Sequence, residues 1–230
     1  MKKRRLNFFI VFFITFSLML TPLKLAETVS SIGFETGVVV IDAGHGGIDG
    51  GVTGKRTGVK ESELNLDVCK KISDCLDEKV ISSVLTRKNQ EGLYGLPTKG
   101  FKKRDMNKRK NIIDNSNAKI VISIHMNSCP FPERSGAQVF YKKGDEKSLK
   151  LAKKLQEKLN SLPECNKKSS VLTGDYFMLN CTDKVAVLVE CGFLSNSHDE
   201  NLLIKEEYRK KIAVLIADTI FSFLFENAMI

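Results

Sequence analysis

The stretch that most constrains the fold is residues 38–43, which lead into the turn Gly44-His45-Gly46-Gly47. Residues 38–41 are all apolar and β-branched, with no polar alternation. This pattern is typical of a strand buried on both faces of a parallel sheet. Ligand sites in open α/β sheets lie just beyond the carboxyl ends of such strands. The stretch therefore predicts a central parallel strand whose following turn carries His45 to a functional edge.

Two later runs have the same layout. Residues 120–124 are apolar and β-branched apart from one serine, and they end at His125. Residues 185–189 form another apolar run, which ends at Glu190. If these strands are parallel to the first, their carboxyl ends meet at one edge of the sheet, so we expect His45, His125 and Glu190 to lie together there. Three titratable residues at equivalent strand ends predict a site.

The rest of the chain alternates between helical and strand patterns. The predicted helices are one capped by Ser62, a polar helix over 104–115, an amphipathic helix over 146–160 and a final helix over 202–225. Besides the three runs above, strands are predicted over 80–86 and over 137–141, and the second of these suits the sheet edge. A loop is expected over 90–103 and an irregular basic segment over 163–172. This alternation predicts an α/β fold with a mainly parallel sheet in a single domain.

Residues 1–26 have the pattern of a targeting segment. A basic cluster at residues 2–5 precedes an apolar run over residues 6–23, as in the n-region and h-region of a signal peptide. Ala26 suits the last residue of a cleaved signal, but Lys24 is not small, and the run is short for a spanning helix. A cleaved signal peptide and a retained membrane anchor therefore both stay open, and either exports the chain. We expect residues 27–36 to be a linker and residues 37–230 to form the folded domain.

Charge and cysteine content limit the classes of partner and chemistry. The net charge of +9 suits an anionic partner such as nucleic acid, an acidic membrane or a wall polymer, or else reflects a solvated lysine-rich surface. The six cysteines show no CxxC spacing, which argues against a zinc ribbon or a redox motif. We expect most of them to be small core residues, with a Cys165–Cys181 bridge left open.

His45, Glu61 and His125 are candidate metal ligands. Glu61 precedes the helical pattern of residues 62–76, where compensation of the helix dipole is the alternative role. Two histidines and one carboxylate form a known zinc ligand set with an open fourth position. A metal held in this way polarises a carbonyl group and makes a bound water ionisable near neutral pH. Such chemistry needs a proton-transfer group that is not a ligand, and Glu190 fits that role.

Five blocks occur in the order of a known family. They are VIDAGHGG at residues 40–47, ESELNL at 61–66, Thr86-Arg87, SIHMN at 123–127 and LVECGFLSN at 188–196. Together they resemble the zinc-dependent N-acetylmuramoyl-L-alanine amidases of the amidase-3 type. The resemblance implies that His45, Glu61 and His125 bind one Zn²⁺ and that Glu190 is catalytic. It also implies a twisted sheet flanked by helices on both faces.

The resemblance implies a function as well. Members of this family hydrolyse the amide bond between N-acetylmuramic acid and L-alanine in peptidoglycan. A single catalytic domain behind an export segment resembles the sporulation-specific amidases of the spore cortex, whose product is converted to the muramic-δ-lactam needed for germination. We therefore expect an exported protein, secreted or membrane-anchored, that acts at the forespore cortex, with no nucleic-acid partner. The match is weak over residues 174–179, which leaves the substrate contacts open there.

An accessory protein is a further expectation. The chain shows no wall-binding repeat although its expected substrate is insoluble, and the Gly- and Lys-containing stretch over residues 50–60 could be loose ahead of Glu61. A partner could supply targeting or metal loading, aided by the membrane if the N-terminal segment is uncleaved and by a basic surface around residues 142–168. A self-sufficient monomer is the alternative.

Three other classes of function fit the sequence less well. The glycine-rich turn could cradle a phosphate, but residues 44–51 lack both GxGxxG spacing and a GK[ST] ending. A Cys–His hydrolase based on Cys191 conflicts with the buried position expected for this cysteine. A non-catalytic wall- or partner-binding protein with a degenerate site also stays open, and zinc content would discriminate it from an enzyme. The third histidine, His198, is expected to cap a surface helix.

Overall fold

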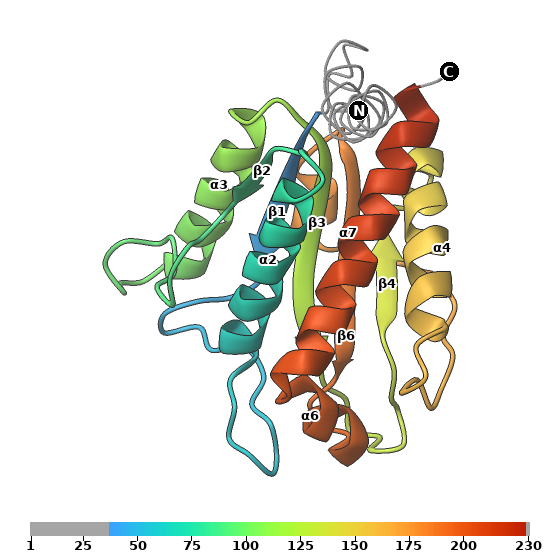
Figure 1. Ribbon diagram of the computed structural model, residues 1–230. Helices are drawn as coiled ribbons and strands as arrows, with labels where there is room; N and C mark the ends of the chain where they lie inside the picture. The colour runs from blue at the N-terminus through green and yellow to red at the C-terminus, as the bar shows by residue number, and fades with distance from the viewer. Residues whose placement is uncertain (1–36, 229–230) are drawn as a thin grey trace, which may run out of the picture. The chain divides into compact units, whose positions relative to one another are not determined.

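The computed structural model describes residues 37–228, whose strands form one six-stranded sheet in the order β2-β1-β3-β6-β4-β5 (Figure 1). In chain order the elements are β1 (Val38–Ala43), α2 (Glu61–Asp77), β2 (Ser83–Leu85), α3 (Phe101–Asp114), β3 (Ala118–Asn127), β4 (Gln138–Tyr141), α4 (Glu146–Asn160), β5 (Leu172–Thr173), α5 (Phe177–Asn180), β6 (Val185–Phe193), α6 (Ser197–Leu203) and α7 (Glu206–Ala228).

The three strands predicted to share one edge do so. β1 pairs in parallel with β3, with Ile41 opposite Ile122, and β3 pairs in parallel with β6, with Ile122 opposite Val187. These side chains are fully or almost fully buried, because helices cover both faces of the sheet. Continuous apolar runs are stable in such strands, since each strand buries both of its faces. The carboxyl ends of all three strands therefore lie at one edge, toward the bottom of Figure 1.

Helices cover the sheet on both faces, as predicted. α2, α7 and α4 cross one face, as Figure 1 shows, and pack on the core that contains Ile41, Ile122 and Val187. α3 and α5 lie against the other face, where Ile113 and Met178 join a second cluster. The α/β fold with a mainly parallel sheet in a single domain is confirmed, with one antiparallel strand pair, β4 and β6.

The structure corrects the predicted sheet edge. β4 lies between β6 and β5, so it is an internal strand rather than an edge strand. The edge is the two-residue β5, which falls at the end of the segment expected to be irregular. A very short edge strand offers few unpaired backbone groups to another chain, which limits edge-to-edge association.

Helix boundaries also differ from the predicted ones. α3 spans Phe101–Asp114 rather than residues 104–115, so its first residues fall in the segment expected to be a loop. Ser62 is not an N-cap, because α2 already begins at Glu61, and the preceding Lys60 makes no side-chain cap. The final helix is divided into α6 and α7. His198 lies in the first turn of α6, and the cap is Asn196, whose side chain accepts hydrogen bonds from the backbone N–H groups of His198 and Asp199.

The remaining predictions concern the N-terminal segment and the cysteines. The signal or anchor at residues 1–26 and the linker at residues 27–36 lie outside the described residues. Within residues 37–228, no helix is long and apolar enough to span a membrane. All six cysteines are free thiols, so Cys165 and Cys181 form no bridge in the structure.

Candidate active site

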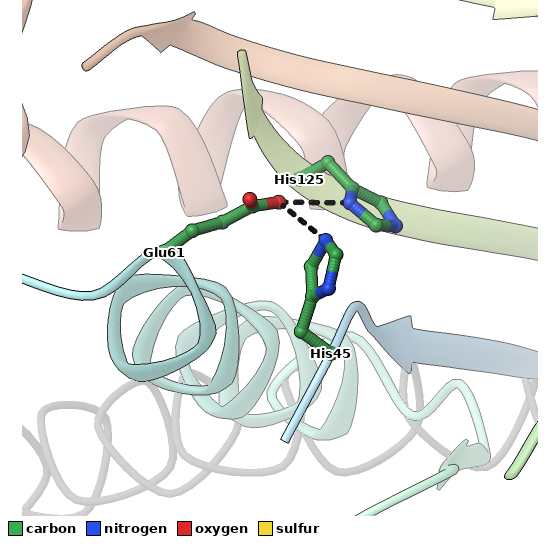
Figure 2. Close-up of side chains that lie close together, drawn as sticks. All are labelled: His45, Glu61 and His125. Atoms are coloured by element: carbon green, nitrogen blue, oxygen red, sulfur yellow. Dashed lines mark hydrogen bonds and ion pairs between the residues drawn. The ribbon is translucent and has the colours of Figure 1, made fainter. Parts of the chain in front are cut away.

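The three candidate ligands converge at the carboxyl edge of the sheet (Figure 2). His45 follows β1, Glu61 begins α2, and His125 lies near the end of β3. Glu61 Oε1 lies 3.2 Å from His45 Nε2 and 2.9 Å from His125 Nδ1, and the three ligand atoms all lie within 4.8 Å of one another. Segments distant in sequence thus form a His–Glu–His group that could hold a metal ion.

Two glycines leave space for this group. A Cβ atom on Gly44 would lie 2.2 Å from Cε1 of His125, and a Cβ atom on Gly51 would lie 2.4 Å from Oε2 of Glu61. Both distances are far below van der Waals contact. The glycines of this edge therefore allow the backbone to approach the candidate ligands closely.

Hydrogen bonds fix the orientation of Glu61 and His45. The buried carboxylate of Glu61 accepts a hydrogen bond from Val52 N at 2.9 Å and another from Met126 N at 3.2 Å. The Nδ1 atom of His45 lies 3.1 Å from Oδ1 of Asp49, while its Nε2 atom faces Glu61. A carboxylate on the far nitrogen is a common way to fix the ring of a metal-binding histidine.

The electrostatics favour a charged carboxylate at the centre. Burial alone would raise the pKa of Glu61, but hydrogen bonds and charge interactions with His125 and His45 outweigh it and hold the pKa far below its usual value. Burial likewise opposes protonation of His45, but Glu61 and Asp49 outweigh it and raise the pKa of His45. Glu61 is therefore ionised at neutral pH and supplies the negative charge that a bound cation requires.

A buried arginine lies beneath the turn that carries His45. The guanidinium of Arg109 is fully buried and donates to carboxylate oxygens of Asp42 and Asp105, both at 2.6 Å. It also donates to the backbone carbonyls of Ala43 at 2.7 Å and His45 at 2.6 Å. Removal of one partner of such a network would leave a buried charge unpaired, which is strongly destabilising. The network therefore stabilises the turn in its observed position against α3.

A second buried arginine, which follows β2, contacts the same turn. Arg87 donates hydrogen bonds to the backbone carbonyls of Ala43 at 3.0 Å, Gly44 at 3.1 Å and Asn89 at 2.9 Å, and to that of Ser62. It therefore links the end of β1 to the start of α2, which are the segments that present His45 and Glu61. The roles of Arg87 and Arg109 were not predicted from the sequence. The only local signal for Arg109 is its i,i+4 spacing from Asp105 in a polar helix.

Glu190 lies beside the His–Glu–His group. It is opposite His125 in the β3–β6 register, and its side chain is 8% exposed. Its Oε2 atom is buried without a hydrogen-bond partner among the described residues. Burial raises the pKa of Glu190 to about 7, and the charge of Glu61 adds to this effect while His125 and His45 oppose it. A carboxyl group with this pKa can both accept and release a proton near neutral pH.

A cavity of about 250 Å³ opens onto these groups. His45, His125 and Glu190 line it together with residues of α3 and α5. Apolar and aromatic side chains form much of its wall, among them Phe101, Met106, Tyr176, Phe177, Met178 and Leu188. The weakly matching residues 174–179 therefore contribute directly to the cavity wall.

A mainly parallel α/β sheet thus places two histidines, a carboxylate and a further buried carboxyl group at one edge, a set of residues that suits metal-assisted hydrolysis. Residues 39–222 match the family model described as N-acetylmuramoyl-L-alanine amidase. The chain belongs to this family and is an amidase.

Curated relatives and solved structures agree with this assignment. The chain is 35% identical over 194 residues to the germination-specific N-acetylmuramoyl-L-alanine amidase of Bacillus subtilis, a match that covers 83% of this chain and 81% of the relative. It is 28% identical over 236 residues to the amidase AmiA of Escherichia coli, covering 83% of this chain and 78% of AmiA. The CwlD amidase of Clostridioides difficile, solved in complex with the GerS lipoprotein, superposes with a TM-score of 0.78 at 34% identity, covering 83% of this chain and 99% of that chain.

Proposed function

We propose that His45, Glu61 and His125 bind one Zn²⁺ and that the enzyme uses it to hydrolyse the amide bond between N-acetylmuramic acid and L-alanine, which removes stem peptides from peptidoglycan. The observation that carries this proposal is the convergence of three ligand atoms within 4.8 Å of one another, from three segments of a chain that belongs to the amidase family. Two histidines and one carboxylate suit zinc and leave a fourth position open.

The residues of the chain have distinct roles in this proposal. When bound, the zinc ion would act as a Lewis acid toward the amide carbonyl of the substrate. His45 and His125 would present ring nitrogens to the ion, Glu61 would balance part of its charge, and Asp49 would keep the His45 ring oriented. Glu190 would accept the proton that the attacking water loses and deliver it to the amine of the departing L-alanine. Its raised pKa and unpartnered oxygen support this role.

Cleavage of the amide bond between N-acetylmuramic acid and L-alanine predicts which products are released. Digestion of purified peptidoglycan is expected to release free stem peptides with L-alanine at the N-terminus and to leave glycan without peptides. Mass analysis of the soluble and glycan fractions checks this result. New reducing sugar ends without free peptides would instead show glycoside cleavage and would contradict the proposal.

We further propose that the enzyme acts outside the cytoplasm in the spore cortex and that its product leads to muramic-δ-lactam. The relative from Bacillus subtilis is named as germination-specific, which supports this setting. The signal or anchor pattern of residues 1–26 would provide export. A non-catalytic wall-binding role is less well supported, because the chain belongs to an amidase family and keeps all four site residues.

An accessory protein is part of the proposal. The CwlD amidase was solved in complex with a lipoprotein, and this chain shares its fold. We infer that a partner supports targeting or metal loading of this chain. The expected result is that the enzyme alone hydrolyses intact sacculi slowly or loads zinc incompletely, as measured by elemental analysis and peptide release. Full zinc loading with rapid hydrolysis in the absence of any other protein would contradict this proposal.

A further inference from the structure

The segment that leads into Glu61 is a hairpin. Thr53 and Lys60 form an antiparallel bridge, and Gly54 N donates to Val59 O at 2.8 Å. At the base of this hairpin, Glu61 N donates to Val52 O, and Val52 N donates to Oε2 of Glu61, both at 2.9 Å. Residues 53–60 therefore connect Val52 to Glu61, the two residues that are hydrogen-bonded to each other at the base of the hairpin.

The tip of the hairpin is bound by a side chain from a distant helix. Glu200, in α6, is 1% exposed. Its Oε1 atom accepts hydrogen bonds from Thr57 Oγ1 at 2.7 Å, from Thr57 N at 2.8 Å and from Arg56 N at 3.1 Å. Hydrogen bonds to a charged acceptor are stronger than those between neutral groups. One buried carboxylate thus organises backbone donors that the hairpin could not satisfy within itself.

A glycine allows this carboxylate to approach. A Cβ atom on Gly54 would lie only 2.5 Å from Oε1 of Glu200 and 2.9 Å from Oγ1 of Thr57. The φ of Gly54 is outside the left-handed region, so the backbone itself does not require glycine here. Glycine is needed at position 54 for the contact with Glu200, so Gly54 and Glu200 support the hairpin through the same contact.

We propose that Glu200 is a positioning residue for the metal centre and that, by fixing the hairpin over residues 53–60, it sets the affinity of the site for zinc. This inference rests on the proposed function, in which Glu61 is a ligand. A hairpin without Glu200 samples more conformations, and only the fraction that places Glu61 correctly binds metal. Apparent affinity falls in proportion to that fraction. The support that the sequence led us to expect from a partner is thus provided in part by the chain itself.

The test measures zinc affinity by competition with a chelator in the full chain. Glu200→Ala is expected to weaken zinc binding by about tenfold, at the low end of the effect of residues that support metal ligands. Glu200→Gln keeps one acceptor oxygen and is expected to lose less. The matched control is Asn201→Ala, which removes only the 2.8 Å contact to the Arg56 side chain and is expected to leave the affinity within about twofold of the wild type.

Two further readouts separate positioning from general stability. At saturating zinc, Glu200→Ala is expected to recover the kcat of the wild-type enzyme, because bound zinc selects the conformation that places Glu61 correctly, whereas a lasting change in the catalytic geometry would keep kcat low. Gly54→Ala is expected to weaken zinc binding as Glu200→Ala does, and the double variant is expected to be no weaker than either, because both changes break one contact.

Unchanged zinc affinity in Glu200→Ala, with a lowered melting temperature of the metal-free protein, would overturn the inference. Fully additive losses in the double variant would also overturn it. These failures are distinguishable from failure of the proposed function, because in them the wild-type protein binds zinc and His125→Ala does not. Wild-type protein that binds no zinc would overturn both proposals.

Discussion

Replacing His125 by alanine is expected to abolish both zinc binding and amidase activity. It offers one of the three candidate ligand atoms, its Nδ1 atom lies 2.9 Å from Glu61 Oε1, and its ring fills the space beside Gly44. Loss of a residue that only supports a ligand costs about 10- to 100-fold in metal affinity, so loss of the ligand itself is expected to cost more than about 100-fold. Elemental analysis after purification and chelator competition measure the zinc, and peptide release measures the activity.

His198→Ala is the matched control for this variant. His198 is the remaining histidine, and its Nε2 atom lies 3.0 Å from the backbone carbonyl oxygen of Glu164, outside the candidate site. This variant is expected to keep the zinc stoichiometry of the wild type. A His125→Ala protein that also kept the wild-type stoichiometry would show that the ligand assignment is wrong.

Replacing Glu190 by glutamine is expected to lower kcat by about 10²- to 10⁴-fold while zinc stays bound, which is the usual contribution of a general acid–base group. Glutamine has nearly the same shape but cannot take up and release the proton. The register places Glu190 beside His125, but its carboxylate is not part of the three-residue group. Single-turnover rates and zinc content are measured on the same preparation. Zinc lost together with rate would make Glu190 a ligand rather than a proton carrier.

The same variant has a second expected effect, on the stability of the metal-free protein. Glu190 has a pKa of about 7 in the folded chain, above its usual value of 4.5, because the carboxylate is buried. The folded state therefore binds more protons than the unfolded state between these values, and stability falls as pH rises through this window. Glu190→Gln is expected to melt above the wild type at pH 8, with the difference vanishing near pH 4. An equal difference at both pH values would contradict the burial argument.

Much of the candidate site follows from strand ends alone. β-branched runs identified β1, β3 and β6, and parallel pairing was enough to bring His45, His125 and Glu190 to one edge. α4 was predicted with its observed bounds, because its apolar spacing is regular and Asp145 caps it through a hydrogen bond from Ser148 N. The local sequence pattern was sufficient to predict these elements, because their buried residues recur at the regular spacing of a strand or a helix.

Side-chain contacts between segments that are distant in sequence were not predicted. Arg109 resembles an ordinary surface arginine in the sequence, and Arg87 was noted only as part of the Thr86-Arg87 block, yet both donate hydrogen bonds to backbone carbonyls at the end of β1 and the turn after it. Glu200 reaches the hairpin across 143 residues from Thr57, and no local period encodes that contact. The position of β4 was wrong for a related reason, since its outer neighbour β5 is too short to give a pattern.

The most direct measurement of the central claim is the location of the metal by anomalous X-ray scattering at the zinc edge from crystals of the purified enzyme. One peak is expected at about 2.0–2.2 Å from His45 Nε2, Glu61 Oε1 and His125 Nδ1, with Glu190 outside bonding distance. A peak elsewhere in the molecule, or one without Glu61 among its ligands, would contradict this claim.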